Sequence, residues 1–389
     1  MTTRSTFEQD VHTLESALAD PDVFAHLPAA TALIARLGED GDRAPGALVA
    51  RAILAAARHW VRAGKLAEGC NVLALAHAFG DRVPPAERIE LLVLEAGHAV
   101  ERLDLGHAID MAAAGFHIAQ ASGEESRVPS LLAAYSTALN LAGLPAEAER
   151  VMNRALTLNA ALPENKRQSG RLWINAYHAL MAQDKFDEAI AACKNAIALS
   201  DSTDPFRRDS IWCLAYARHA GVALLKGDVP TAEALIRLAR ATLGGNLRVR
   251  DRWALELIEA LFAVAQDNTE SARAHVEAVL TRGEDITRGN ALAARSNYVK
   301  LLQRLGDEKS ADAEMRVLAE SRLRAYKTLI ESTRYNPDNP TQPPTSSQSA
   351  RMRVLAPPVV QGAAASAGSL ELLERLAVTA EFRDDTTGK

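Results

Sequence analysis

Residues 173–196, WINAYHALMAQDKFDEAIAACKNA, contain an apolar helix, a short turn and a second helix rich in alanine. Trp173 opens the first helix. Ala189, Cys193 and Ala196 recur on one face of the second helix. Small side chains at these positions let the two helices pack closely, because a large side chain would hold the backbones apart. One such pair cannot bury its apolar face alone, so the stretch predicts neighbouring copies.

The copies are present at a regular spacing. The first small residue of each second helix, which we call the anchor, recurs every 39 to 43 residues, at Gly69, Ala108, Ala148, Ala189, Ala232, Ala272 and Ala311. Glu256 and Arg295 replace the large residue of the first helix in the last two copies. A period near 40 predicts an array of stacked helix pairs rather than several separate globular domains.

The spacing of large and small residues resembles that of the tetratricopeptide repeat, whose standard period is about 34 residues. The resemblance covers residues 46–330 and is closest at the triplets Ala148-Met152-Ala155, Ala189-Cys193-Ala196 and Ala232-Ile236-Ala239. It implies an all-α fold, a right-handed α-solenoid of about seven helix pairs. Other alanine-rich solenoid families share the small-residue spacing and remain the alternative.

Four segments are expected along the chain. Residues 1–45 read as N-terminal capping helices over 6–18 and 22–38, and residues 46–333 as the repeat array. Residues 334–368 are rich in Pro, Ser and Ala and predict a disordered linker. Residues 369–389 begin as an amphipathic helix.

Composition limits the partners and the location of the chain. A net charge of -5, a pI near 6.1 and 5% aromatic residues argue against nucleic acid as a partner. No window approaches eighteen uninterrupted apolar residues, so no membrane span is expected. The three unpaired cysteines, Cys70, Cys193 and Cys213, predict buried thiols in a reducing, cytoplasmic location.

A second resemblance lies near the C-terminus. Residues 373–388, LERLAVTAEFRDDTTG, are similar to the opening helix of the HD-GYP family of cyclic di-GMP phosphodiesterases. The resemblance implies that the array regulates a cyclic di-GMP signalling protein. In that family the metal-binding histidines follow this helix, and they do not occur in this chain.

Catalytic patterns are missing from the sequence. There is no Gly-x-Ser-x-Gly elbow and no phosphate-binding Gly-x-x-x-x-Gly-Lys motif. His98, His107 and His117 lack the carboxylate-flanked spacing of a zinc helix. We therefore expect no enzymatic activity, no cofactor and no metal site.

Binding is the expected function. In tetratricopeptide relatives, ligand-facing side chains come from the first helices, and the matching positions here are Arg51, Arg58, Arg62, Thr137, Asn140, Arg171, Asn175, His178, Arg218, Asn297, Lys300 and Gln303. Asparagine can bond both backbone N–H and C=O groups, and arginine can fork onto a carboxylate. The set predicts a groove for a protein or an extended peptide, although the second copy differs with Glu90, Val93 and Glu101.

Two functions follow from these observations. The first is a non-catalytic sensory or protein-interaction region of a cyclic di-GMP signalling protein. The alternative is a free-standing adaptor whose tail, residues 369–389, docks on a partner or inhibits the array. A peptide-sensing transcriptional regulator has less support, because no DNA-reading helix-turn-helix precedes the repeats. A homodimer through residues 307–330 or through the tail helix is also expected.

Overall fold

The computed structural model describes residues 2–20, 22, 24–162, 166–200, 205–242, 249–281, 295, 298, 299, 302, 303 and 306–331. All regular structure in these residues is helical. The α-helices are α1 (Thr2–Ser16), α2 (Leu27–Asp40), α3 (Gly46–Arg62), α4 (Leu66–Ala74), α5 (Pro85–Glu101), α6 (Leu105–Ser122), α7 (Val128–Leu141), α8 (Pro145–Ala160), α9 (Lys166–Met181), α10 (Phe186–Ala198), α11 (Pro205–Leu225), α12 (Val229–Thr242), α13 (Val249–Ala265), α14 (Thr269–Thr281) and α16 (Glu308–Glu331). Three 3₁₀ helices join them, η1 (Ala17–Ala19), η2 (Leu75–Arg82) and η3 (Glu125–Arg127).

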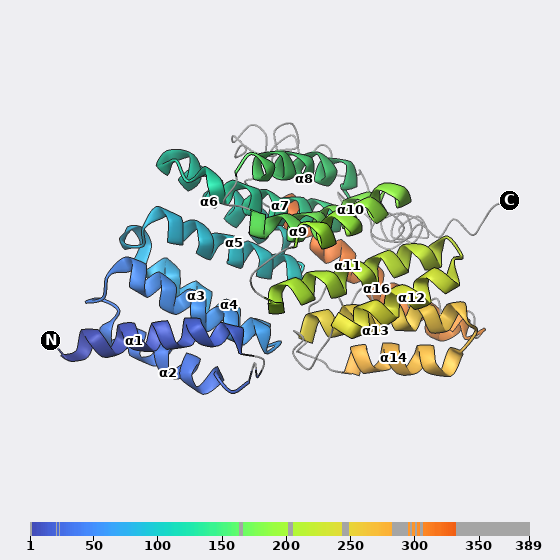
Figure 1. Ribbon diagram of the computed structural model, residues 1–389, viewed down its shortest axis with the longest axis horizontal. Helices are drawn as coiled ribbons and strands as arrows, with labels where there is room; N and C mark the ends of the chain where they lie inside the picture. The colour runs from blue at the N-terminus through green and yellow to red at the C-terminus, as the bar shows by residue number, and fades with distance from the viewer. Residues whose placement is uncertain are drawn as a thin grey trace, which may run out of the picture.

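The helices from α3 onward are arranged in consecutive pairs, which confirms the all-α solenoid predicted from the anchors. The two helices of each pair, from α3 with α4 to α13 with α14, contact each other extensively. Figure 1 shows the pairs following one another from the blue to the orange end of the chain. None of the described helices is long and apolar enough to cross a membrane.

The anchors are buried at the contact between the two helices of each pair. The six alanine anchors are at most 2% exposed, and Gly69 is also buried. A Cβ atom on Gly69 would lie 2.8 Å from Cγ2 of Val61, so even alanine would crowd the approach of α4 to α3. The repeated small residues therefore set the distance between the helices.

A second repeated feature lies five residues before each anchor. The residue there has a positive φ, between 56° and 82°, in all seven copies: Gly64, Leu103, Gly143, Asp184, Gly227, Asp267 and Gly306. The N–H of the next residue donates to the carbonyl five residues earlier, for example Lys185 to Leu180 at 3.1 Å. This is the Schellman arrangement that ends a helix and reverses the chain.

Four of these turns also cap the second helix with a side chain. Asp228 Oδ1 accepts a hydrogen bond from the N–H of Thr231 at 3.1 Å, and Asn268 Oδ1 accepts from Ser271 in the same way. Asp104 and Asp307 occupy the same position in their copies. These oxygens satisfy N–H groups that the first turn of a helix leaves without partners. The turn and the cap together fix where each second helix begins.

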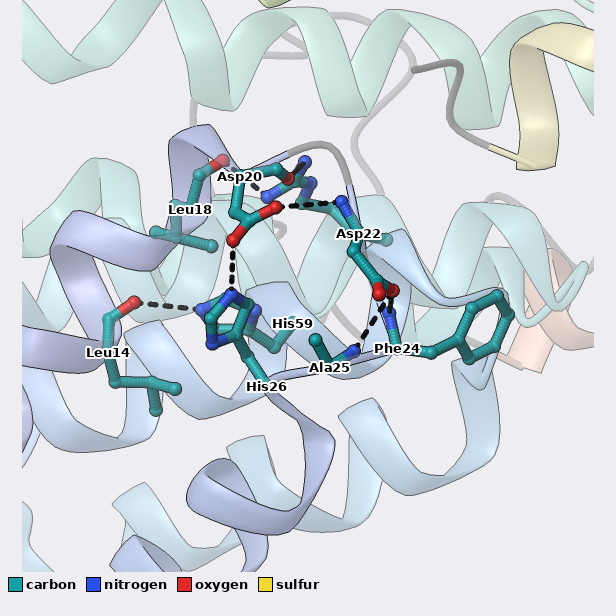
Figure 2. Close-up of polar contacts among 9 residues, drawn as sticks. Leu14, Leu18, Asp20, Asp22, Phe24, Ala25, His26 and His59 are labelled. Carbon is teal, nitrogen blue, oxygen red and sulfur yellow. Dashed lines mark hydrogen bonds and ion pairs between the residues drawn. The ribbon is translucent and has the colours of Figure 1, made fainter. Parts of the chain in front are cut away.

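The N-terminal cap differs from the prediction in one respect. The second helix was expected to begin near residue 22, but α2 begins at Leu27. Asp20 Oδ1 accepts from the N–H of Asp22, and Asp22 Oδ1 accepts from the N–H groups of Phe24 and Ala25 (Figure 2). These local bonds favour a turn over a helix, because short acidic side chains compete for the backbone N–H groups.

Side chains of α3 attach this cap to the array. His59 Nε2 donates to the carbonyl of Leu14 at 2.8 Å (Figure 2). Arg62 donates to the carbonyls of Leu18 and Asp20. His59 is fully buried, and burial lowers the pKa of its imidazole. The cap is therefore held by hydrogen bonds to backbone carbonyls as well as by apolar contacts of Phe7, Val11 and Leu14.

The last described helix does not pack only within its own copy. Helix α16 contacts α6, which is the second helix of the second copy and lies five copies earlier in the chain. In Figure 1 the orange α16 runs behind α9 and α11 toward the green helices. Segments almost two hundred residues apart in the sequence thus lie side by side, Leu105–Ser122 and Glu308–Glu331.

The segments that were predicted after the array, residues 334–368 and 369–389, lie outside the described residues. Cys193 and Cys213 are buried as expected, and burial raises the pKa of each thiol to about 12. Cys70 is only half-buried.

The anchors carry the first testable prediction. Ala189 is fully buried between α9 and α10, whereas Ala191 lies on the exposed face of α10. We expect Ala189→Leu to destabilise the protein by about 1–3 kcal/mol, because the larger side chain must push two packed helices apart. Chemical denaturation measures the change, and Ala191→Leu is the matched control. Equal stability of the two variants would contradict the role given to the anchors.

Candidate functional site

The first helices form the inner layer of the array. Among the described helices, each of α3, α5, α7, α9 and α11 contacts the next first helix, up to α13. The second helices α4, α6, α8, α10, α12 and α14 have no contact of similar extent with the next second helix. Because the layer whose helices lie closer together is on the inside of a curve, the first helices line the concave side. This places the predicted binding positions on one wall.

A polar cluster joins α9 and α11 on this wall. The Tyr177 hydroxyl donates to the carbonyl of Arg218 at 3.2 Å, and the Arg218 guanidinium lies 5.3 Å from the centre of the Tyr177 ring. Arg218 Nη1 also donates to the carbonyl of Ile174 at 3.4 Å and contacts His178 Nε2. These contacts hold the guanidinium in one orientation, because the ring, the carbonyl and the imidazole each restrict it.

Two more predicted residues extend this cluster along α9. Arg171, Asn175 and His178 follow one another at intervals of four and three residues, so they share one face of the helix. Arg171 is exposed, and Asn175 and His178 are partly exposed. We call the set of Arg171, Asn175, His178 and Arg218, whose role in binding is a prediction, the binding face. Four of the twelve predicted positions are therefore brought together by two neighbouring helices.

The arginines of the first copy are bound within the chain. Arg51 Nε donates to Glu15 Oε1 at 2.9 Å, and this hydrogen bond raises the pKa of the guanidinium. Arg58 forms an ion pair with Glu90, and Arg62 is 7% exposed and holds the carbonyls of the cap. Their predicted role in the groove remains a prediction, but each already has an intramolecular partner.

Glu90 explains why the second copy departs from the basic pattern. Its carboxylate lies between two arginines, with Oε1 accepting from Arg58 and Oε2 accepting from Arg127 Nη1 at 3.3 Å. These residues come from α3, α5 and η3. An acidic residue in one first helix thus balances basic residues on the neighbouring elements, and it links three consecutive parts of the array.

The other predicted positions are spread along the array. Thr137 Oγ1 donates to Ala133 O at 2.9 Å in its own helix, and Asn140 is 4% exposed. Gln303 is exposed, whereas Asn297 and Lys300 lie outside the described residues. Tyr177 was not among the predicted residues, because an aromatic residue in a first helix is more often a packing residue. Its signal was a Tyr and an Arg two repeat positions apart in neighbouring copies, twelve residues before Ala189 and fourteen residues before Ala232.

Comparison with known proteins supports the fold. No protein-family model matches the chain, and no curated protein matches it either. A solved structure of a Rap protein complexed with competence and sporulation factor aligns with a TM-score of 0.67 and 11% identity, covering 84% of this chain and 89% of that chain. The APC/C hetero-tetramer Cut9-Hcn1 aligns with a TM-score of 0.51 and 13% identity, covering 84% and 55%.

At these identities the likeness is one of fold. The chain has the tetratricopeptide-like arrangement of consecutive helix pairs that the sequence predicted. The comparisons with family models and with curated proteins give no support for the HD-GYP resemblance. The residues that carry this resemblance, 373–388, lie outside the described part of the chain.

Two histidines and a glutamate form a titratable cluster at the contact of η2, α5 and α6. Glu95 Oε1 accepts from His107 Nε2 at 2.9 Å and from His77 Nε2 at 3.2 Å. Burial acts to raise the pKa of Glu95, but the two hydrogen bonds outweigh burial and the pKa is lowered. The hydrogen bond to Glu95 raises the pKa of His107. His117, also on α6, is exposed, and His98 is buried.

This cluster predicts a pH dependence of stability. The lowered pKa of Glu95 contributes stability above its ordinary value of 4.5, and this contribution is lost as the pH falls through the lowered pKa. The raised pKa of His107 contributes below its ordinary value of 6.5 and is lost as the pH rises through the raised pKa. We therefore expect His107→Ala to lower the free energy of unfolding most between these two values, by less than about 1 kcal/mol because the pair is partly exposed.

Urea denaturation at a series of pH values measures the difference between the two proteins. The exposed His117→Ala on the same helix is the control and should show no such maximum. A stability loss in His107→Ala that is the same at pH 5.5 and pH 9 would argue that His107 contributes only packing.

Proposed function

We propose that this chain binds a protein or peptide segment through the binding face on α9 and α11. The proposal rests on the face of α9 that Arg171, Asn175 and His178 share, and on the contact of His178 with Arg218 of α11, in the inner layer of a tetratricopeptide-like solenoid. The Rap protein with a similar fold was solved in complex with competence and sporulation factor. That complex is a property of the Rap protein, and it supports binding here only by analogy of fold.

The side chains of the binding face suit an extended segment with an acidic group. The amide of Asn175 can donate to a backbone carbonyl and accept from a backbone N–H. Arg171, which is exposed, can form a forked pair with a carboxylate. Arg218 is already oriented by Tyr177 and Ile174, so little side-chain freedom is lost when it binds a ligand.

Binding is centred on α9 and α11 rather than on α3. Arg51, Arg58 and Arg62 on α3 have partners in α1, α5 and the cap. A ligand there would have to replace an ion pair or uncap backbone carbonyls, which costs free energy. In the fourth copy, Arg171 is exposed and Asn175 is partly exposed on α9.

Of the two functions expected from the sequence, the binding scaffold agrees better with the fold. The regulation of a cyclic di-GMP phosphodiesterase rests on residues 373–388 alone, and neither the described helices nor the compared proteins add to it. A non-catalytic binding module requires only the inner wall of first helices and its polar side chains.

Two variants with the same change of charge test the proposal. Arg171→Glu alters the binding face, and Arg237→Glu places the same change on the exposed side of α12, a second helix. The full chain and both variants are used to capture partners from a lysate of the source cells, and the affinity for each captured protein or peptide is then measured. We expect at least a tenfold loss of affinity for Arg171→Glu, since a charge-assisted pair becomes a repulsion.

The control should bind like the unmodified protein. Asn175→Ala provides a second, uncharged change on the same face and should also weaken binding. A partner that is lost in Arg237→Glu and retained in both binding-face variants would place recognition on the outer layer and overturn the proposal.

A further inference from the structure

A histidine and two glutamates meet between α13 and α14, outside the binding face. Glu256 and Glu259 lie one helical turn apart on α13, and His275 faces them from α14. His275 Nδ1 lies 2.7 Å from Glu256 Oε2 and 3.6 Å from Glu259 Oε2. One ligand atom from each residue lies within 4.8 Å of the other two. Among the described residues, no other three His, Cys, Asp or Glu side chains bring their ligand atoms this close together.

The charges of this cluster are only partly balanced. The Glu259 side chain is 10% exposed, and its Oε1 accepts a hydrogen bond from Arg240 Nε at 2.6 Å. Arg240 thus neutralises one carboxylate, while Glu256 adds a second one that is 24% exposed. Two carboxylates and one arginine leave one negative charge, which His275 or a bound cation would have to balance. A buried or half-buried carboxylate without a cation is costly, so the site favours an added positive charge.

Arg240 also sets the direction of Glu259. Because Oε1 is held by Arg240, the second oxygen, Oε2, is the one that lies toward His275. In metal sites, a neighbouring side chain commonly forms a hydrogen bond with the atom of a ligand residue that does not bind the metal. This bond fixes the orientation of the ligand before the ion binds. The arginine therefore orients a donor oxygen rather than filling the position between the three side chains.

We propose that Glu256, Glu259 and His275 bind a divalent transition-metal ion such as Zn²⁺. Donor atoms around tetrahedral zinc lie about 3.3–3.5 Å apart, given metal–ligand distances of about 2.0–2.2 Å. His275 and Glu259 are close to this separation, and His275 and Glu256 must move apart by about 0.6–0.8 Å. The ion takes the place of the hydrogen bond between His275 Nδ1 and Glu256, and water completes its coordination.

The chemistry of the donors selects the class of ion. An imidazole nitrogen with two carboxylate oxygens suits zinc and its neighbours in the first transition series. Mg²⁺ and Ca²⁺ prefer six or more oxygen ligands, which these three side chains do not supply. The bound ion would connect α13 to α14 through side chains, in a copy that lacks the large residue of the earlier first helices.

Sequence spacing did not reveal this site. Glu256 and Glu259 are separated from His275 by the whole turn between the two helices, and the sequence predicted no metal ligands. The donors meet because the pairing of α13 with α14 places one turn of each helix opposite the other. The proposal does not depend on the proposed peptide-binding function.

Equilibrium dialysis of the chelator-treated full chain against Zn²⁺, followed by elemental analysis, tests the proposal. We expect one zinc ion per chain and a higher thermal midpoint when zinc is present. His275→Ala and Glu256→Gln should each lower zinc affinity at least tenfold and abolish the rise in thermal midpoint. Glu256→Gln keeps the size of the side chain, so it gives the answer if His275→Ala does not fold.

Two controls make the result specific. His117→Ala removes an exposed histidine, and His107→Ala disrupts the His–Glu–His cluster on α5 and α6; both should keep the zinc ion. Loss of zinc in His107→Ala with retention in His275→Ala would overturn the proposal. So would an absence of stoichiometric zinc in the unmodified chain, or equal binding of Mg²⁺; either result would leave the cluster as an ion-pair network.

Discussion

The close approach of two helices at each anchor is the constraint on which the array depends. Every anchor is buried, and each lies five residues after a turn residue with a positive φ. The turn sets the direction in which the second helix leaves, and the anchor lets that helix reach its partner. Since both features keep the same spacing through all seven copies, each pair presents a similar surface to the next. The inner layer of first helices, and the positions on it, follow from this repetition.

Some features of this fold could be predicted from the sequence, and others could not. The anchors from Gly69 to Ala311 predicted the helix pairs, because a small side chain at a helix contact has a steric reason to recur. The turn at Asp184 was predicted, but its positive φ was not, since Leu103, Asp184 and Asp267 take a conformation that normally favours glycine. The start of α2 was predicted several residues too early, because local hydrogen bonds of Asp20 and Asp22 decide it.

The candidate site shows the same division. Repeat positions placed Arg171, Asn175, His178 and Arg218 on first helices, where the structure also has them. What repeat positions cannot indicate is which charges are balanced within the chain. Glu90 holds Arg58, and Glu15 holds Arg51, through contacts between side chains more than thirty residues apart. Such pairing depends on rotamers and on neighbouring elements, so it appears only when the helices are placed in space.

The contact of α16 with α6 changes the thermodynamic character of the array. In an open solenoid each copy interacts only with its neighbours, and a terminal copy can unfold without affecting distant ones. Here the last described helix, α16, contacts α6 of the second pair, so two distant parts of the array are joined. Unfolding of the C-terminal copy also removes a contact from α6, and unfolding around α6 removes support from α16. We therefore expect these two regions to unfold together rather than as independently fraying repeats.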